Sequence, residues 1–183
     1  MPDRWLYLEF LVPMKDYTET LDRKEFVFDW IFPLILSLLI YFFLLRSSTY
    51  SNETGVFTGN VLNVLGVLFG FSIASITLLI TSSSDTIKLI KEKRVKNRTI
   101  NGKSISVYQL TIITFTFLLF LELFGIIFNF LLALLVLSSP EFWESSWKIF
   151  CAVDFLILAQ VVALNVRNTT NIYFVFLEPF RTK

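Results

Sequence analysis

The chain has 183 residues, of which 55% are hydrophobic, with a mean hydropathy of +0.66 and a net charge of +1. A water-soluble domain of this length has too high a surface-to-volume ratio to hide that much apolar surface. The apolar residues also occur in long runs, which is typical of segments that cross a bilayer. These observations exclude a water-soluble domain and indicate an all-α integral membrane protein.

The residue types that carry most enzymatic chemistry are missing from the sequence. There is no histidine, and the single cysteine, Cys151, cannot form an internal disulfide. Histidine is the commonest general base and metal ligand, so its absence excludes a Ser-His-Asp triad, a Cys-His dyad and a His-ligated zinc site. Gly-rich phosphate loops and the GxGD signature of intramembrane aspartyl enzymes do not occur either. We therefore expect no enzymatic activity, no cofactor and no metal.

Four segments are apolar enough to cross about 30 Å of hydrocarbon as helices, which takes about 20 residues each. The predicted spans are residues 30–45, 59–81, 108–137 and 147–165. The first is short and its start is open, because Asp22 with Glu25 resembles a capping box, whereas Asp29 could cap a later start. With the earlier start, Pro33 would lie inside the helix and should kink it.

The basic residues are distributed unevenly along the chain. Of the 16 Lys and Arg residues, all but Arg46 and Lys148 lie in the N-terminal segment, in the loop between the second and third spans, or in the C-terminal tail. The positive-inside rule places these three regions, and therefore both termini, in the cytoplasm. The predicted parts are an N-terminal segment, a transmembrane domain, the basic loop within it and a tail (1–28, 29–166, 82–107 and 167–183).

The second span carries a continuous face of small or polar residues, spaced three and four apart. This small-residue stripe consists of Gly59, Asn63, Gly66, Gly70, Ala74 and Thr77. Lipid provides no hydrophobic drive for helices to associate, so small residues that permit close approach mark helix contacts in membranes. The stripe predicts a contact either within one subunit or between subunits of a homo-oligomer, and in both cases it makes this helix central.

The third and fourth spans contain acidic residues. Glu122 lies near the middle of the third span on one face with Asn129, and Asp154 lies in the fourth. No Lys or Arg lies in the core of a span to neutralise them, and an ionised acid at that depth is costly. Because Glu122 and Asp154 fall at nearly the same depth, we expect them to lie close together and share a proton or hydrogen bond. They could form a cation or proton path, or be protonated acids that hold helices together.

The loop between the second and third spans is predicted to be structured. No residue breaks a helix between Asp85 and about Lys96, so the second span should continue beyond the membrane. Asn101-Gly102 between alternating residues then signals a short hairpin. The basic residues of the loop are Lys88, Lys91, Lys93, Arg94, Lys96, Arg98 and Lys103. They suit anionic lipid or a cytosolic protein, or serve only as a topology determinant, and nothing in the loop has the base-reading character that nucleic-acid binding needs.

Two apolar segments, residues 5–12 and 172–179, are too short to span the membrane. Each can lie at the membrane interface, pack against the basic loop or dock a partner. Exposed apolar segments of this kind are unusual unless something covers them. We therefore favour a contact with a partner protein or a second subunit on the cytoplasmic side.

The runs FDWIFPLILSLLIYFFLL and NVLGVLFGFSIASITLLITSSSDTIKLIKEK resemble the four-span membrane subunits of bacterial antiphage-defence systems, most of all that of the Kiwa system. The resemblance covers about half of the chain and is one of composition and order. It implies a homo-oligomer, a tetramer, in the bacterial inner membrane that detects infection and works with a cytosolic DNA-binding effector. Other defence membrane proteins, including CRISPR-associated ones, are similar in composition and in the order of their segments.

Three function classes follow, and the missing catalytic signatures argue against the third, a membrane-embedded enzyme. A sensor or scaffold that recruits or regulates a cytosolic effector would depend on the basic loop. A homo-oligomeric pore that permeabilises or depolarises the inner membrane would depend on a water-lined axis and on Glu122, Asn129 and Asp154. The absence of a fixed-charge ring inside the membrane favours the scaffold over a selective channel.

Overall fold

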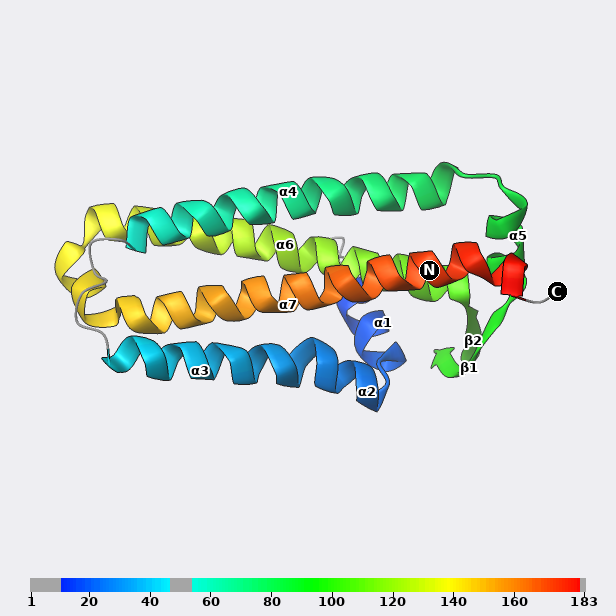
Figure 1. Ribbon diagram of the computed structural model, residues 1–183, viewed down its shortest axis with the longest axis horizontal. Coiled ribbons are helices and arrows are strands. Elements are labelled where there is room, and N and C mark those ends of the chain that lie inside the picture. The colour runs from blue at the N-terminus through cyan, green and yellow to red at the C-terminus, as the bar shows by residue number, and fades with distance from the viewer. Residues whose placement is uncertain (1–10, 47–53, 182–183) are drawn as a thin grey trace, which may run out of the picture.

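The computed structural model describes residues 11–46 and 54–181, and most of them are helical (Figure 1). The elements in chain order are α1 (Val12–Thr20), α2 (Arg23–Phe26), the π-helical turn η2 (Val27–Ile31), α3 (Phe32–Arg46), α4 (Thr54–Thr81), α5 (Asp85–Glu92), β1 (Arg94–Ile100), β2 (Lys103–Ser106), α6 (Val107–Ser138) and α7 (Pro140–Arg181). Four helical stretches are long and apolar enough to cross a membrane, as predicted. They are Arg23–Leu44, Phe57–Thr81, Val107–Ser138 and Ser146–Phe174.

The long helices run side by side with α6 and α7 in the middle (Figure 1). α4 packs on both of them, whereas α3 packs on α7. In the most apolar stretch of α7, 50% of the residues are buried, against 17% in the corresponding stretch of α4. Within one chain the second span is therefore not central as predicted, because α4 buries one face only, while α7 touches three other long helices.

The first membrane-crossing helix begins at the earlier of the two candidate starts. Asp22 and Glu25 form a capping box, in which the Asp22 backbone N–H donates to Glu25 Oε2 at 3.1 Å. Pro33 therefore lies inside the helix, as the second residue of α3 after η2. A proline ring clashes with the carbonyl four residues earlier, and a wider π-helical turn accommodates it. The sequence predicted a kink at Pro33, and the structure shows a π-helical turn before it.

The second span ends at Thr81 and does not continue into the loop. Three serines follow, and the Ser84 hydroxyl caps α5 by accepting from the Ile87 N–H at 3.4 Å. Serine side chains compete with the helix for backbone hydrogen bonds, and this favours a break followed by a new cap. α5 ends at Glu92, and residues 94–96, which were expected to be helical, belong to β1.

The predicted hairpin is present. β1 and β2 are antiparallel, with Ile100 opposite Lys103 at the tip. Asn101 and Gly102 between them have φ values of 50° and 76°. Two successive positive φ angles are what a two-residue type I′ turn requires, and Asn-Gly is its preferred sequence.

The fourth span and the C-terminal tail form one helix. α7 runs on to Arg181, well beyond the predicted end at residue 165, because no proline interrupts it before Pro179. Ile172, from the apolar segment expected to dock a partner, packs against the core of the bundle. Residues 5–10 of the other apolar segment lie outside the described residues.

Candidate functional site

A first buried polar cluster joins α4, α6 and α7 around Glu122, whose side chain is fully buried. Its Oε1 accepts a hydrogen bond from Ser72 Oγ at 3.0 Å and another from Asn165 Nδ2 at 3.0 Å. Glu122 Oε2 and Asn165 Oδ1 have no hydrogen-bond partner within the described ranges. The acid thus links three membrane-crossing helices through one of its two oxygens.

A second buried cluster joins α6 and α7 around Asp154. Asn129 Nδ2 donates to Asp154 Oδ1 at 2.7 Å and to the Gly125 carbonyl at 2.9 Å. Both side chains are almost completely buried. Asp154 Oδ2 and Asn129 Oδ1 find no partner among the residues that the structure describes. The three intramembrane polar residues of the sequence prediction are therefore all interior.

The two acids do not bond to each other, which corrects the prediction that Glu122 and Asp154 share a proton or hydrogen bond. Each is paired with an amide on the neighbouring helix instead. The prediction of equal depth for Glu122 and Asp154 required α6 and α7 to run antiparallel from the first residue after their connection. The first turns of α7 instead run across the end of the bundle (Figure 1), so each α7 partner lies farther from Ser139 along the chain than its α6 partner does.

The two clusters share one hydrogen-bonding pattern. In each, the amide N–H donates to one carboxyl oxygen, and no donor within residues 11–46 and 54–181 reaches the other carboxyl oxygen or the amide oxygen. Both remaining atoms are acceptors when the acid is ionised, whereas a protonated carboxyl has an O–H that can donate to the amide oxygen. Since an ionised acid is costly at this depth, the pattern favours neutral acids that hold helices together over a cation path.

A third cluster, which the sequence analysis missed, lies where α1, η2 and α7 meet. The Arg167 guanidinium is paired with the fully buried Asp29 carboxylate, and Tyr17 Oη donates to Asp29 Oδ2 at 2.7 Å. The guanidinium also lies over the Tyr17 ring, 5.6 Å from its centroid. Burial, with the hydrogen bond to Asp29, raises the pKa of the Tyr17 phenol above its usual range, so the hydroxyl stays a proton donor.

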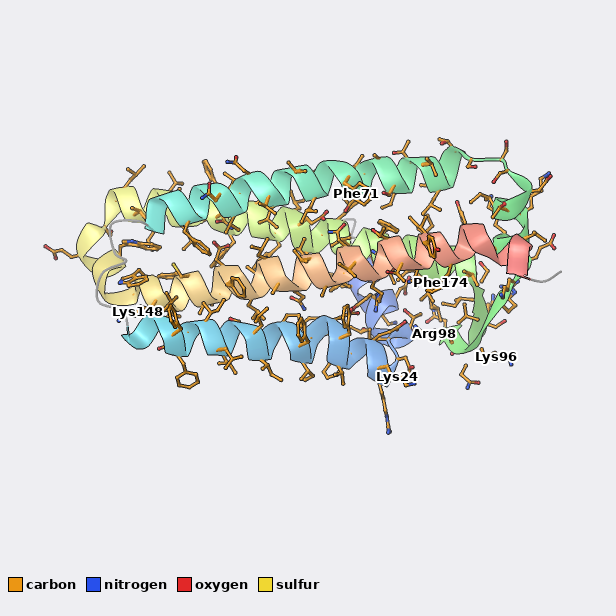
Figure 2. The ribbon with its side chains drawn as sticks, in the orientation of Figure 1. Lys24, Phe71, Lys96, Arg98, Lys148 and Phe174 are labelled. Atoms are coloured by element: carbon orange, nitrogen blue, oxygen red, sulfur yellow. The ribbon has the colours of Figure 1, made fainter. Side chains whose placement is uncertain are left out.

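Arg98 extends this cluster to the hairpin. Its two terminal nitrogens donate to the Glu25 carboxylate at 2.7 and 2.9 Å, and one of them also donates to the Thr20 carbonyl at 2.5 Å. Arg167 lies 3.7 Å from the same Glu25 carboxylate. Arg98 was predicted as a contact for a partner or lipid, but it is half-buried and holds β1 against α1 and α2 (Figure 2).

The other predicted basic contacts are accessible. The exposed members are Lys88, Lys91, Lys93, Arg94, Lys96 and Lys103. Lys88 pairs with Asp85 at 2.9 Å, but this pair is solvent-exposed and such pairs contribute little to stability. The end of the molecule formed by α5 and the hairpin therefore presents a basic surface.

The small-residue stripe of α4 faces outward. All six of its residues are exposed, and they lie on the side of α4 opposite Leu65 and Ser72, which pack inward. A Cβ atom added at Gly66 or Gly70 would meet no neighbouring element within 4 Å among the residues that the structure describes. This contradicts the alternative that the stripe packs inside one subunit, and a contact between subunits stays a prediction.

At Gly125 on α6, side chains of the neighbouring helices fill the space that a Cβ atom would occupy. A Cβ atom there would lie 2.9 Å from Ile157 Cγ2 and 2.9 Å from Leu65 Cδ1. We expect Gly125→Ala to destabilise the protein, because overpacking costs about 1–3 kcal/mol and outweighs the gain of about 1 kcal/mol in helix propensity. Gly66→Ala is the matched control and should leave the stability of the monomer unchanged or raise it. Unfolding in detergent measures both, and equal effects would contradict the packing argument.

Comparisons with known proteins assign no family to this chain. No protein-family model, no curated protein and no solved structure matches it.

Proposed function

We propose that this protein is a homo-oligomeric membrane scaffold or sensor that recruits or regulates a cytosolic effector, as the membrane subunit of a bacterial antiviral defence system. The observation that carries the proposal is the presence of two separate exposed surfaces, the small-residue stripe of α4 and the basic surface of α5 and the hairpin. The first suits a second copy of the chain within the membrane. The second suits an acidic soluble protein. The resemblance of the first two spans supplies the defence context.

The distribution of basic residues over the fold supports a cytoplasmic location for the hairpin. α1, α2, the hairpin and the C-terminal end of α7 gather at one end of the bundle (Figure 1). Lys148 lies at the opposite end, far from Lys24, Lys96 and Arg98 (Figure 2). Lys and Arg residues concentrate in cytoplasmic loops, so the proposal puts this end on the cytoplasmic side of the bacterial inner membrane.

Self-association through α4 is tested by filling its stripe. We expect Gly66→Leu to weaken the oligomer about tenfold or more, because overpacking costs about 1–3 kcal/mol and 1.4 kcal/mol is a factor of ten. Val64→Leu is the matched control, since Val64 is also exposed on α4 but lies outside the stripe. The intact mass of the complex in mild detergent reports the outcome. An oligomer that tolerates Gly66→Leu as well as Val64→Leu would assemble through another surface.

Recruitment is tested by purification from native cells with identification of co-purifying proteins. We expect a soluble protein to be retained and to be lost from the variant Lys88→Gln/Lys96→Gln. The control is Lys15→Gln/Lys24→Gln, which removes two exposed lysines from α1 and α2 at the same end of the bundle. Equal loss in both variants would indicate a diffuse charge effect. A homo-oligomer without any partner would argue against a scaffold.

A homo-oligomeric pore is the second candidate function. The observation that favours it is the presence of polar Asn63 and Thr77 in the exposed stripe, since an assembly built around α4 would bring them to its axis. Ion flux into liposomes that Asn63→Leu abolishes would support the pore. Glu122 and Asp154 are buried within a single chain, so their amide variants should leave such an axis intact. A scaffold gives no flux above that of protein-free vesicles.

A further inference from the structure

A cavity of about 820 Å³ opens where the hairpin meets the start of α6. Its lining includes the cationic side chains of Arg94 and Lys103 from the two strands and the apolar side chains of Ile112 and Ile113 from α6. Tyr108 lies between the two groups along the chain and also lines the cavity. The lining therefore combines basic residues of the hairpin with apolar residues, which come from α6 and, at Ile100 and Ile105, from the strands.

The cavity lies at one end of a candidate membrane-crossing helix. α6 is long and apolar enough to cross a membrane, and it begins at Val107. Ile112 and Ile113 follow by about one and a half turns, which is about 8 Å of helix at a rise of about 1.5 Å per residue. Tyrosine prefers the headgroup level, and Tyr108 is the second residue of α6. This order along the chain suits a cavity whose α6 residues face the hydrocarbon and whose basic residues lie outside it.

The basic side can bind a phosphate group. Arg94 and Lys103 are both exposed, and Arg94 uses Nη1 to donate to the Ser104 carbonyl at 3.0 Å. A guanidinium has five N–H donors in a planar fork that matches phosphate oxygens, so donors remain. The Lys91 ammonium lies 4.8 Å from the centroid of the Tyr108 ring and adds a third cation beside the cavity. These charges give the site a preference for an anion.

Asp16 of α1 is the acidic residue in the lining. Its carboxylate accepts hydrogen bonds, so it suits a headgroup that carries hydroxyls beside its phosphate. The volume also falls within the range of about 300–1,000 Å³ that small-molecule sites occupy, which leaves room for more than a free phosphate. Charge, polarity and size together describe a ligand with an anionic, hydroxylated head and an apolar chain.

We propose that this cavity binds an anionic glycerophospholipid. The phosphate lies against Arg94 and Lys103, the glycerol lies beside Tyr108, and an acyl chain runs along Ile112 and Ile113. This site depends on neither an oligomer nor an effector, so it can be tested on the purified chain independently of the proposed function.

The test is native mass spectrometry of the full chain in mild detergent, titrated with phosphatidylglycerol or phosphatidylcholine. The cavity variant is Arg94→Gln/Lys103→Gln, in which Gln keeps a hydrogen-bond donor for the Ser104 carbonyl. The control variant is Lys88→Gln/Lys96→Gln, which removes the same charge from exposed residues outside the cavity lining. We expect the cavity variant to lose phosphatidylglycerol binding about tenfold or more, as charge-assisted hydrogen bonds are lost, and the control to lose less than about twofold.

Three outcomes would overturn the proposal. Equal losses in the two variants would mean diffuse attraction to a basic surface. Equal binding of phosphatidylcholine would mean that the site does not select anionic headgroups. Displacement of phosphatidylglycerol by an equal concentration of glycerol phosphate would mean a site for soluble phosphates, since that probe has the head and no acyl chain. Should the double variant unfold, Lys103→Gln alone is expected to weaken binding, and unchanged binding would count against the site.

Discussion

Replacing Arg167 by methionine is expected to lower the free energy of unfolding by about 3–5 kcal/mol, because it leaves a buried charge without its partner. The Arg167 side chain is 10% exposed and pairs with Asp29, which is fully buried. Methionine keeps most of the apolar stem, so the loss reports the charge and its hydrogen bonds. Unfolding in mixed micelles with increasing denaturing detergent measures the change. Arg23→Met is the control, because Arg23 is exposed on α2.

A second variant distinguishes charge from packing. Asp29→Asn/Arg167→Met removes both charges, and we expect it to be more stable than Arg167→Met alone, because the uncompensated carboxylate is gone. A double variant as unstable as the single one would mean that Arg167 acts through the packing of its stem. Arg167→Met as stable as Arg23→Met would mean that the buried pair contributes nothing to the fold.

Glu122 is expected to tolerate glutamine but not alanine. In Glu122→Ala, the hydroxyl of Ser72 and one N–H of the Asn165 amide lose their acceptor, at about 1–3 kcal/mol for each buried donor left unpaired, while Asn165 Nδ2 keeps its bond to the Val161 carbonyl. In Glu122→Gln, the side-chain oxygen still accepts from both, and the new NH₂ group can donate to Asn165 Oδ1. The cost should therefore stay below about 1 kcal/mol, as is usual when a buried hydrogen-bond pattern is kept.

The same variants separate the two readings of the buried acids. If Glu122 and Asp154 are neutral and hold helices together, Glu122→Gln and Asp154→Asn should keep the stability of the protein and its retention of a soluble partner. Retained stability with lost flux of protons or cations into liposomes would instead support a path for these ions. A Glu122→Gln variant as unstable as Glu122→Ala would show that the folded protein needs the negative charge. The carbonyl stretch of a protonated carboxyl, seen by infrared spectroscopy in the wild type and missing in Glu122→Gln, gives an independent measurement.

Features dictated by local chemistry could be predicted from the sequence. The four spans follow from what a bilayer demands of a helix, and it allows few alternatives. Asp22 with Glu25 and Asn101-Gly102 each determine their structure within four residues, as a capping box and a type I′ turn. The inward face of α6 with Glu122 could also be predicted, because polar residues in a span avoid lipid.

Features that depend on distant partners could not be predicted. Asp29 and Arg167 are 138 residues apart, and only the folded chain brings them together. The partner of Glu122 depends on the relative shift of α6 and α7, which the turn between them sets and the hydrophobic pattern does not. A weak signal for the ion pair did exist, since Asp29 and Arg167 each lie near the same end of a span and carry opposite charges.

The length of α7 has a mechanical consequence. Its membrane-crossing stretch, Ser146–Phe174, has 29 residues and is about 44 Å long at about 1.5 Å per residue, roughly one and a half times the hydrocarbon thickness of about 30 Å. Such a rod behaves as a lever with an arm of about 22 Å on each side of its midpoint, and a tilt of about 10° moves each tip by about 4 Å. A small disturbance at one face of the bilayer is thus delivered to the other face as a displacement larger than a hydrogen bond.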